Sequence, residues 1–217
     1  MRSLNNQFMK RKLLQIFACL VLLCNVNCIV VSAEDGATCT HGKHTFYDHT
    51  LNGGVGNYGY NDRYYWISSS FNSTYTKRIK NAVRDWVYTT DSVGVTTPIS
   101  LVNTSTKSQS VFDVYPSDLG NRILGLTQFY LHGGSSVDPE KKNWSYTKIY
   151  INTSELDNSI YGFTPIQKRA TIEHEFGHAM GLSHRNTKPE SIMCQSGHER
   201  TAEKPIKSDC NNINHLY

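Results

Sequence analysis

Three histidines and one glutamate stand within eleven residues, 174–184, which read H-E-x-x-H-x-x-G-x-x-H. His174 and His178 are four residues apart, so on a helix they lie one turn apart on the same face, and both imidazoles can reach one metal ion. Glu175 points about 100° round the helix axis and can face the open side of that metal without binding it. The spacing therefore indicates a metal site with a carboxylate beside it.

The third histidine, His184, cannot belong to the same straight helix. Ten helical residues would carry it about 15 Å along the axis from His174, whereas a zinc–nitrogen bond spans only about 2 Å. The chain must stop and turn back, and Gly181 stands where this turn is needed, because glycine adopts the left-handed conformation that ends helices at little steric cost. We expect His174, His178 and His184 to bind one zinc ion.

Three neutral histidines leave zinc with an open fourth position for water, as in catalytic rather than structural sites. Zinc can lower the pKa of this water to about 7 and polarise a scissile carbonyl. Glu175 would take the proton of the water during attack on a peptide bond and return it to the leaving amine. The motif therefore predicts hydrolysis of peptide bonds, with Glu175 as the general base.

The motif resembles that of the metzincin clan of zinc peptidases, and most closely its matrixin-type branch. Two further elements carry the resemblance. Ser191-Ile192-Met193 resembles the Met-turn of the clan, and residues 208–217 resemble the S-x-x-D-x-x-x-I-x-x-L-Y helix that closes matrixin catalytic domains. The resemblance implies that Met193 lies beneath the zinc, against the histidines, without binding it.

The helix that carries the motif has a clear start signal. Thr164 is a capping residue, Pro165 occupies the first helical position and Gln167 the capping-box position. Upstream, apolar residues at helical spacing predict a helix that starts near residues 72–74. Aromatic and β-branched residues predict strands in four stretches: 63–67, 99–103, 110–115 and 148–152.

The succession of strand, helix and two strands ahead of the motif is the metzincin order. The resemblance implies an α+β, zincin-like fold. Its parts are a twisted, mostly parallel sheet with one antiparallel edge strand, a zinc-binding helix and a C-terminal helix. Residues 124–130 look like that edge strand, although an interior strand is the alternative by pattern alone. An extended substrate can pair with an open edge, so the expected substrate-binding residues are Leu126, Thr127, Gln128 and Phe129.

Residues 1–33 read as a secretory signal peptide. Basic residues precede an apolar run, Leu13 to Leu23, and Val31-Ser32-Ala33 offers a cleavage site ahead of Glu34. The run is shorter than the about 20 residues of a membrane span. We therefore expect a secreted, extracellular protein without a stable membrane anchor.

The signal segment holds four of the 22 basic residues and none of the 18 acidic ones, so the rest of the chain carries 18 of each. This balance gives no argument for a nucleic-acid partner. We expect a protein or peptide substrate as the partner, and a monomer.

Three cysteines, Cys39, Cys194 and Cys210, lie outside the signal segment. In an oxidising exterior, one disulfide and one free thiol is the simplest arrangement. We prefer a Cys194–Cys210 disulfide, because it would tie the Met-turn to the closing helix. Pairing of Cys39 with either partner remains open, because connectivity does not follow from sequence.

Residues 34–61 are expected to be an irregular N-terminal segment ahead of a catalytic domain over residues 62–217. A glycine-rich stretch at 52–59 does not suit a helix or strand interior. The segment also holds residues that could bind a metal: Cys39, His41, His44 and His49. Their spacings fit no recognised zinc framework, which favours an exposed arm with polar side chains.

Some positions depart from the family pattern. Arg185 stands where matrixins usually have serine or threonine, and Gln195 where astacin-type enzymes have a tyrosine. The loop over residues 132–146 lacks the histidine and aspartate run of matrixin structural-metal sites, so calcium is possible but not evident. Residues 194–198 are expected to wall the pocket for the residue after the scissile bond. The sequence does not give the shape of this wall, so it predicts no substrate preference.

The sequence thus predicts a secreted zinc endopeptidase. One alternative is a secreted zinc-containing binding protein or effector without turnover, and the intact Glu175 argues against it. A second alternative is a zincin with a glutamate as third ligand, and His184 after Gly181 argues against that.

Overall fold

The computed structural model describes residues 42–120 and 122–217. The predicted signal peptide lies outside these residues, as do Cys39 and His41. Among the described residues, none of the helices has the length and the apolar character that crossing a membrane would require.

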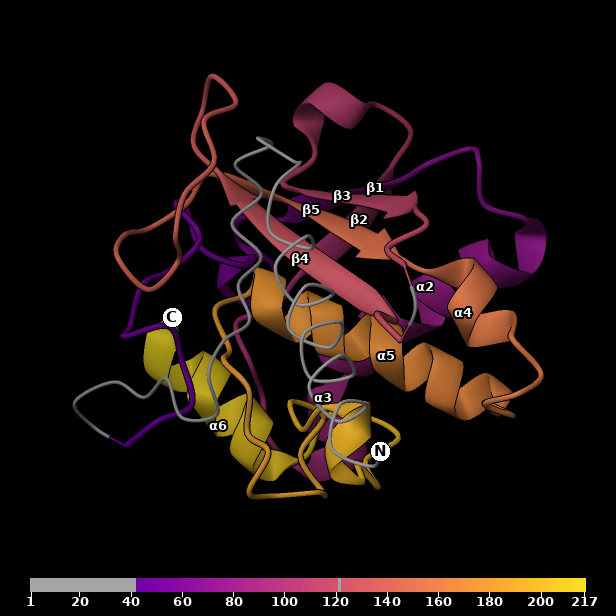
Figure 1. Ribbon diagram of the computed structural model, residues 1–217. Helices are drawn as coiled ribbons and strands as arrows, with labels where there is room; N and C mark the ends of the chain where they lie inside the picture. The colour runs from indigo at the N-terminus through magenta and orange to yellow at the C-terminus, as the bar shows by residue number, and fades with distance from the viewer. Residues whose placement is uncertain (1–41, 121) are drawn as a thin grey trace, which may run out of the picture.

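A five-stranded sheet with the strand order β2-β1-β3-β5-β4 forms one layer of the molecule (Figure 1). β4 runs antiparallel to β5, and the other neighbours are parallel. The predicted α+β fold, with a mostly parallel sheet and one antiparallel edge strand, is therefore confirmed. The strands are β1 (Arg63–Ile67), β2 (Leu101–Thr104), β3 (Phe112–Pro116), β4 (Gly125–Tyr130) and β5 (Tyr146–Ile151).

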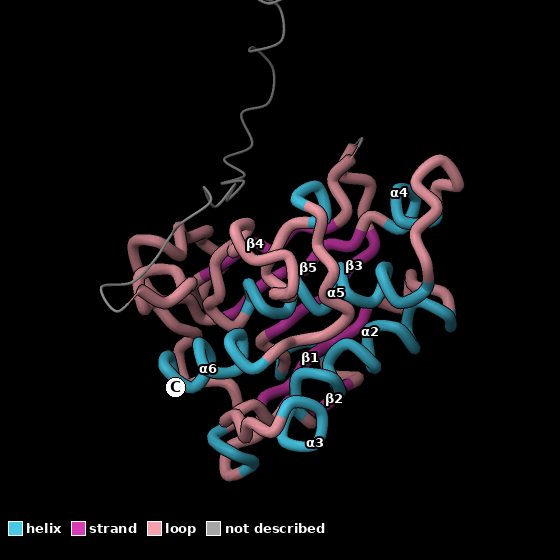
Figure 2. Tube along the Cα trace, turned by 90° about the horizontal axis from the view of Figure 1, so that it is seen from below, coloured by secondary structure: helices cyan, strands magenta, loops and turns pink. Residues whose placement is uncertain are grey.

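Helices pack beneath this sheet, and seen from below they lie in front of the strands (Figure 2). The long helices α2 and α5 contact each other, and α5 also contacts β4 and β5. The motif-bearing helix is α5, so the packing places the motif beneath the β4 edge. The helices are α2 (Ser73–Val87), α3 (Thr89–Val93), α4 (Thr153–Asp157), α5 (Pro165–Ala179) and α6 (Lys207–Leu216).

Aromatic side chains fix the position of α5. Phe176 on α5 packs edge-on against Tyr65 of β1 and Phe112 of β3. From α2, the indole of Trp86 donates a hydrogen bond of 2.9 Å to the carbonyl of Glu173. Contacts on both sides explain why the second half of α5 is buried all round rather than amphipathic.

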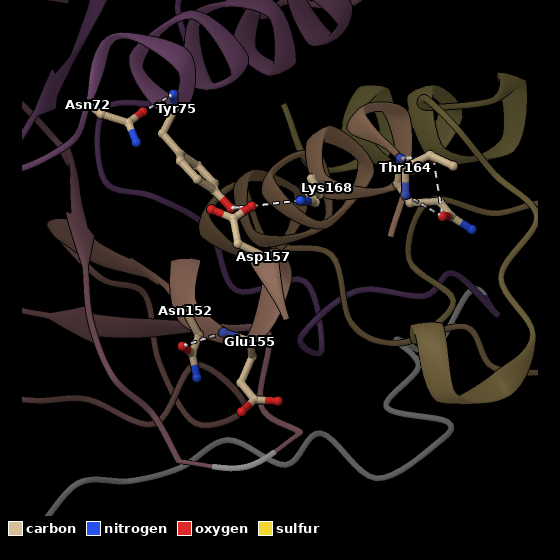
Figure 3. A network of polar contacts seen from close by, with 8 residues as sticks. Asn72, Tyr75, Asn152, Glu155, Asp157, Thr164 and Lys168 are labelled. Carbon is tan, nitrogen blue, oxygen red and sulfur yellow. Dashed lines mark hydrogen bonds and ion pairs between the residues drawn. The ribbon is translucent and has the colours of Figure 1, made fainter. Parts of the chain in front are cut away.

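Capping side chains mark the starts of α2 and α5 (Figure 3). The side chain of Asn72 accepts from the backbone N–H of Tyr75 at the start of α2. Thr164 and Gln167 form the capping box of α5, as the sequence predicts. Each cap satisfies N–H groups that the first helical turn leaves without partners.

The N-terminal segment differs from its prediction. Phe46, Leu51 and Val55 are buried in the core, so the part of 34–61 that the structure describes is not an exposed polar arm. The N–H of Phe46 donates to Gly181. The described part of this segment therefore packs against the same core as the site.

Candidate active site

The structure brings the three predicted metal ligands together. His174, His178 and His184 are buried, and one ligand atom of each lies within 4.8 Å of the others. Nε2 of His178 lies 3.0 Å from Nε2 of His174 and 3.1 Å from Nε2 of His184. Donors bound tetrahedrally about 2 Å from zinc lie roughly 3.3 Å apart, so this spacing fits one zinc ion.

Backbone carbonyls orient two of the histidines. Nδ1 of His174 lies 2.8 Å from the carbonyl oxygen of Ile192, and Nδ1 of His178 lies 2.7 Å from that of Leu182. A carbonyl can only accept, so each Nδ1 carries the proton and each Nε2 presents a lone pair. Two lone pairs facing each other at 3.0 Å are repulsive unless a cation lies between them, and this donor chemistry fits zinc.

The pKa values of His174 and His178 lie well below the usual histidine value. Burial is the main cause, and the neighbouring histidines add to it. Both imidazoles are therefore neutral at pH 7, which is the form that binds a metal.

The turn at Gly181 returns the third histidine, as predicted. Its φ is 105°, a conformation that favours glycine. An added Cβ would also lie 2.8 Å from Cδ1 of Leu216 and 3.3 Å from the carbonyl oxygen of His49. The N-terminal segment supports this turn, because the N–H of Ser183 donates to the carbonyl of His44.

His44 and His49 form no second metal site. Their Nδ1 atoms lie near the backbone oxygens of His184 and Phe46. In the part of the chain that the structure describes, the three motif histidines make up the single group with metal-binding geometry.

Glu175 lies in the same cleft, and β4 holds it in place. The hydroxyl of Thr127 donates to Oε2 of Glu175 across 2.8 Å. A Cβ added to Gly125 would lie 2.6 Å from Oε1 of Glu175, so the strand leaves space for this carboxyl group only because residue 125 is glycine. Burial raises the pKa of Glu175 to about 7, while the hydrogen bond from Thr127 and the charge of Arg200 oppose this rise.

Met193 packs under the helix at Gly177, where an added Cβ would overlap its sulfur atom. The Met-turn is held from α6 by Asp209. Oδ1 of Asp209 accepts from the Ser191 hydroxyl at 2.5 Å, and Oδ2 accepts from the N–H of Ile192 at 3.1 Å. Met193 therefore contacts the ligand helix at Gly177, between His174 and His178 in the sequence, and its predicted packing against the histidines themselves stays a prediction.

The predicted Cys194–Cys210 disulfide is absent from the structure, where both residues are buried and are not bonded to each other. Sγ of Cys194 lies 3.5 Å from the carbonyl oxygen of Gln195. The Met-turn is instead connected to α6 through the hydrogen bonds from Ser191 and Ile192 to Asp209. Hydrogen bonds therefore stand where a covalent bond was expected. Pairing that involves Cys39 lies outside the described residues.

A cleft of about 380 Å³ opens over the histidines and Glu175. Residues of β4 and of the loop before it form one wall, and the loop after the Met-turn forms the other. Among the predicted substrate residues, Leu126, Thr127 and Phe129 line the cleft. Gln128 does not, because its Oε1 accepts from the hydroxyl of Tyr130 instead. The predicted pocket wall is present in Gln195, Ser196 and Gly197.

Two contributors to the site were not identified by sequence reasoning. Gly125 gives Glu175 its space, and Arg200 lines the cleft beside it. No sequence pattern indicates the contact of Gly125 with Glu175. For Arg200, the sequence offers only its position, two residues after the predicted pocket wall of residues 194–198.

A search of curated proteins finds no match. One similar solved structure is high choriolytic enzyme 1, a hatching-enzyme zinc-protease from the medaka fish Oryzias latipes, with 17% identity and a TM-score of 0.43, covering 73% of this chain and 90% of that one. Another is the structure of myroilysin, with 15% identity and a TM-score of 0.33, covering 59% of this chain and 51% of that one.

The sequence model of the matrixin family matches residues 65–217. These residues include every strand of the sheet except the first two residues of β1, together with the three histidines, Glu175 and α6. The match and the histidine geometry agree, and the chain belongs to the matrixin family of zinc metalloproteases.

Proposed function

We propose that the protein is a secreted zinc endopeptidase in which His174, His178 and His184 hold the catalytic zinc and Glu175 is the general base. The observation that carries this assignment is the position of Glu175. Its carboxyl group lines the same cleft as the three histidines, is buried, and is held by a hydroxyl from the edge strand. A purely structural zinc site gains nothing from such a carboxylate.

The zinc held by these histidines would polarise a scissile carbonyl and acidify a water molecule. Glu175 takes up the proton of the attacking water and delivers it to the leaving amine. In the metal-free protein, burial raises the pKa of Glu175 to about 7, and a carboxylate of raised basicity is a better proton acceptor than an exposed one. Thr127 keeps the carboxylate oriented while its charge changes.

The edge strand supports binding of an extended peptide. β4 pairs with β5 on one side, it is the edge strand of the sheet, and several of its residues line the cleft. A peptide added to this edge forms backbone hydrogen bonds that ignore side-chain identity. We propose that the peptide pairs with the backbone of residues 125–127, because the carbonyl of Phe129 already accepts from the N–H of Val137, while the side chains of Leu126 and Thr127 contact the peptide from the cleft wall.

A cleavage assay tests the assignment of Glu175. We expect the Glu175→Gln variant to bind one zinc per chain and to lose peptide hydrolysis by a factor of about 10² or more. Glu203→Gln, at an exposed position, is the matched control and should keep full activity. Cleavage of a denatured protein should stop on addition of chelator and return with zinc. Undiminished activity of Glu175→Gln would remove the mechanism, and a zinc-loaded wild type without turnover would favour a binding protein.

Secretion is also proposed, from the basic and apolar pattern of residues 1–33, and so is a monomeric state, because residues of one chain line the whole cleft that the structure describes. Expression of the full chain in a secreting host, followed by N-terminal sequencing of the medium, should give a chain that starts at Glu34. Light scattering of this product should give the mass of one chain. Retention of residues 1–33 on the active protein would contradict the signal peptide.

A further inference from the structure

Arg200 places a guanidinium group in the wall of the active-site cleft. Nη1 donates to the carbonyl oxygen of Cys194 at 3.3 Å, and Nη2 donates to the hydroxyl of Thr171 at 3.2 Å. Both acceptors are uncharged. Among the described residues, no carboxylate lies within the 4.0 Å of an ion pair with this guanidinium. The side chain is therefore a partly buried cation without a direct anionic partner.

This cation has capacity left to bind a ligand. A guanidinium carries five N–H donors in a planar fork, and the two hydrogen bonds to Cys194 and Thr171 use only part of it. Burial lowers the pKa of Arg200, whereas the carboxylates of Glu175 and Glu173 act on it from a longer distance and oppose that shift. A carboxylate brought into the cleft would satisfy both the charge and the free donors.

The position of Arg200 indicates which substrate residue it meets. Thr171 lies three residues before His174 on α5, so Arg200 reaches the cleft near the ligand helix, within range of the charge of Glu175. Glu175 is the group that delivers a proton to the leaving amine. Because Glu175 must reach this amine, the substrate residue that carries it would lie on the side of the cleft that Gln195, Ser196 and Arg200 line.

We propose that this pocket takes an acidic side chain, aspartate or glutamate, from the residue directly after the scissile bond, and that Arg200 is the specificity-determining residue. The inference rests on the proposed function, because the pocket is assigned by the role of Glu175. A second cation, Arg122, lines the opposite part of the cleft but is exposed. Solvent screens an exposed charge more strongly than a partly buried one, so Arg122 contributes less to selection.

The first experiment measures cleavage preference without a known substrate. Wild-type protein loaded with zinc is incubated with a library of peptides derived from a proteome, and the cut sites are read by mass spectrometry. We expect aspartate and glutamate to be enriched after the cut. Synthetic peptides with the best flanking sequence and glutamate, glutamine, leucine or lysine at this position then give kcat/KM. Glutamate should exceed glutamine by about 10- to 100-fold, the range of a hydrogen-bonded charge.

Variants assign this preference to Arg200. Arg200→Met should bring the glutamate-to-glutamine ratio close to one, and Arg200→Lys should keep part of it. Lys204→Met removes the same charge from an exposed position of the same loop and should leave the ratio unchanged. Arg122→Met tests the second cation. Arg200→Gln can still donate to Thr171, so it serves in place of Arg200→Met if the methionine variant melts at a clearly lower temperature.

A binding measurement separates this inference from the proposed function. The zinc-loaded Glu175→Gln variant is titrated with the same peptides, so selectivity is read without turnover. Tighter binding of the glutamate peptide, lost in the double variant with Arg200→Met, supports the inference independently of the cleavage rates. Three results would overturn it: enrichment of leucine after the cut, equal treatment of glutamate and glutamine, or a uniform loss of activity in Arg200→Met for all four peptides. The last would mean that Arg200 acts only on the charge of Glu175.

Discussion

The hydroxyl of Thr127 donates a hydrogen bond to Oε2 of Glu175 across 2.8 Å, and this hydroxyl oxygen of Thr127 also lies 3.0 Å from the backbone carbonyl oxygen of Glu175. One side chain of the edge strand therefore contacts both polar groups of the proposed general base. β4 thus does more than present its backbone to a substrate, because it also sets the position of the carboxylate over the histidines.

Replacement of Thr127 by valine should slow catalysis without unfolding the protein. Valine has a similar shape but cannot donate, so Glu175 loses its fixed orientation. We expect kcat/KM to fall about 10-fold, with an unchanged zinc content, while Thr127→Ser should retain most of the activity. In the metal-free protein, the pKa of Glu175 should rise above about 7, because the lost hydrogen bond favours the ionised form. Carbon-13 NMR of labelled glutamate measures this shift, and a fall in that pKa would contradict the argument.

Replacement of Gly125 by alanine should displace the same carboxylate by steric contact. The added methyl group would lie 2.6 Å from Oε1 and 2.7 Å from Cγ of Glu175. Because Gly125 is not in a left-handed conformation, alanine costs nothing in backbone strain there. We expect a loss of kcat of about 10²-fold with zinc retained. Thermal unfolding and zinc analysis provide the control, and full activity in Gly125→Ala would show that Glu175 can adopt another productive position.

The metal-binding part of the site was predictable because it is local in sequence. His174, His178 and His184 are positioned by one helix and one glycine turn, whose geometry follows from spacing alone. The capping box at Thr164 likewise depends only on neighbouring residues. By contrast, Thr127 was predicted only as part of a substrate-binding strand, and its hydrogen bond to Glu175 joins residues 48 positions apart. No local pattern encodes such a contact.

Two wrong predictions have related physical causes. Phe46, Leu51 and Val55 are buried, but irregular backbone and glycine turns separate them, so they show no helical or strand period from which burial could be inferred. The preferred Cys194–Cys210 disulfide assumed a covalent connection between the Met-turn and α6, where the structure has hydrogen bonds to Asp209. Similarly, α3 and α4 span five residues each and are too short for a period to be recognised.

The network around Asp157 predicts a pH dependence of stability (Figure 3). Oδ1 of Asp157 accepts from the hydroxyl of Tyr75 at 3.0 Å and from Nζ of Lys168 at 2.6 Å. Burial by itself would raise the pKa of Asp157, but the hydrogen bonds from Lys168 and Tyr75 outweigh it, and the pKa lies below the ordinary 3.8. A carboxyl group with a lowered pKa stabilises the fold above pH 3.8, and this contribution is lost as the pH falls through the lower, folded value.

Asp157→Asn should therefore lower the melting temperature at pH 6 and have little effect at a pH below the folded pKa of this group, where the wild-type carboxylate is protonated. The carboxylate is half exposed, so the difference in the free energy of unfolding should stay below about 1 kcal/mol. Lys168→Met should reproduce the effect, whereas Asp91→Asn, at an exposed position, provides the matched control. An equal loss at both pH values in Asp157→Asn would assign the effect to packing instead of charge.

Asp209 connects the closing helix to the zinc site through a chain of hydrogen bonds. Its Oδ2 accepts from the backbone N–H groups of Ile192 and Ile206, at 3.1 and 3.0 Å. The carbonyl of Ile192 in turn accepts from Nδ1 of His174 at 2.8 Å. The position of a proposed zinc ligand thus depends on a residue 35 positions further along the chain.

Asp209→Asn should weaken both the fold and the zinc site. An amide can accept at only one of the two carboxylate positions, so its NH₂ group must face either two backbone N–H donors or the Ser191 hydroxyl that now donates. We expect a loss of about 3 kcal/mol in the free energy of unfolding, measured by urea denaturation of the metal-free protein, and weaker zinc binding in competition with a chelator. Asn211→Ala, exposed on the same helix, should change neither quantity. If Asp209→Asn loses stability but binds zinc as tightly as the wild type, the Met-turn does not transmit the position of α6 to His174, and the histidines are held by α5 and the Gly181 turn alone.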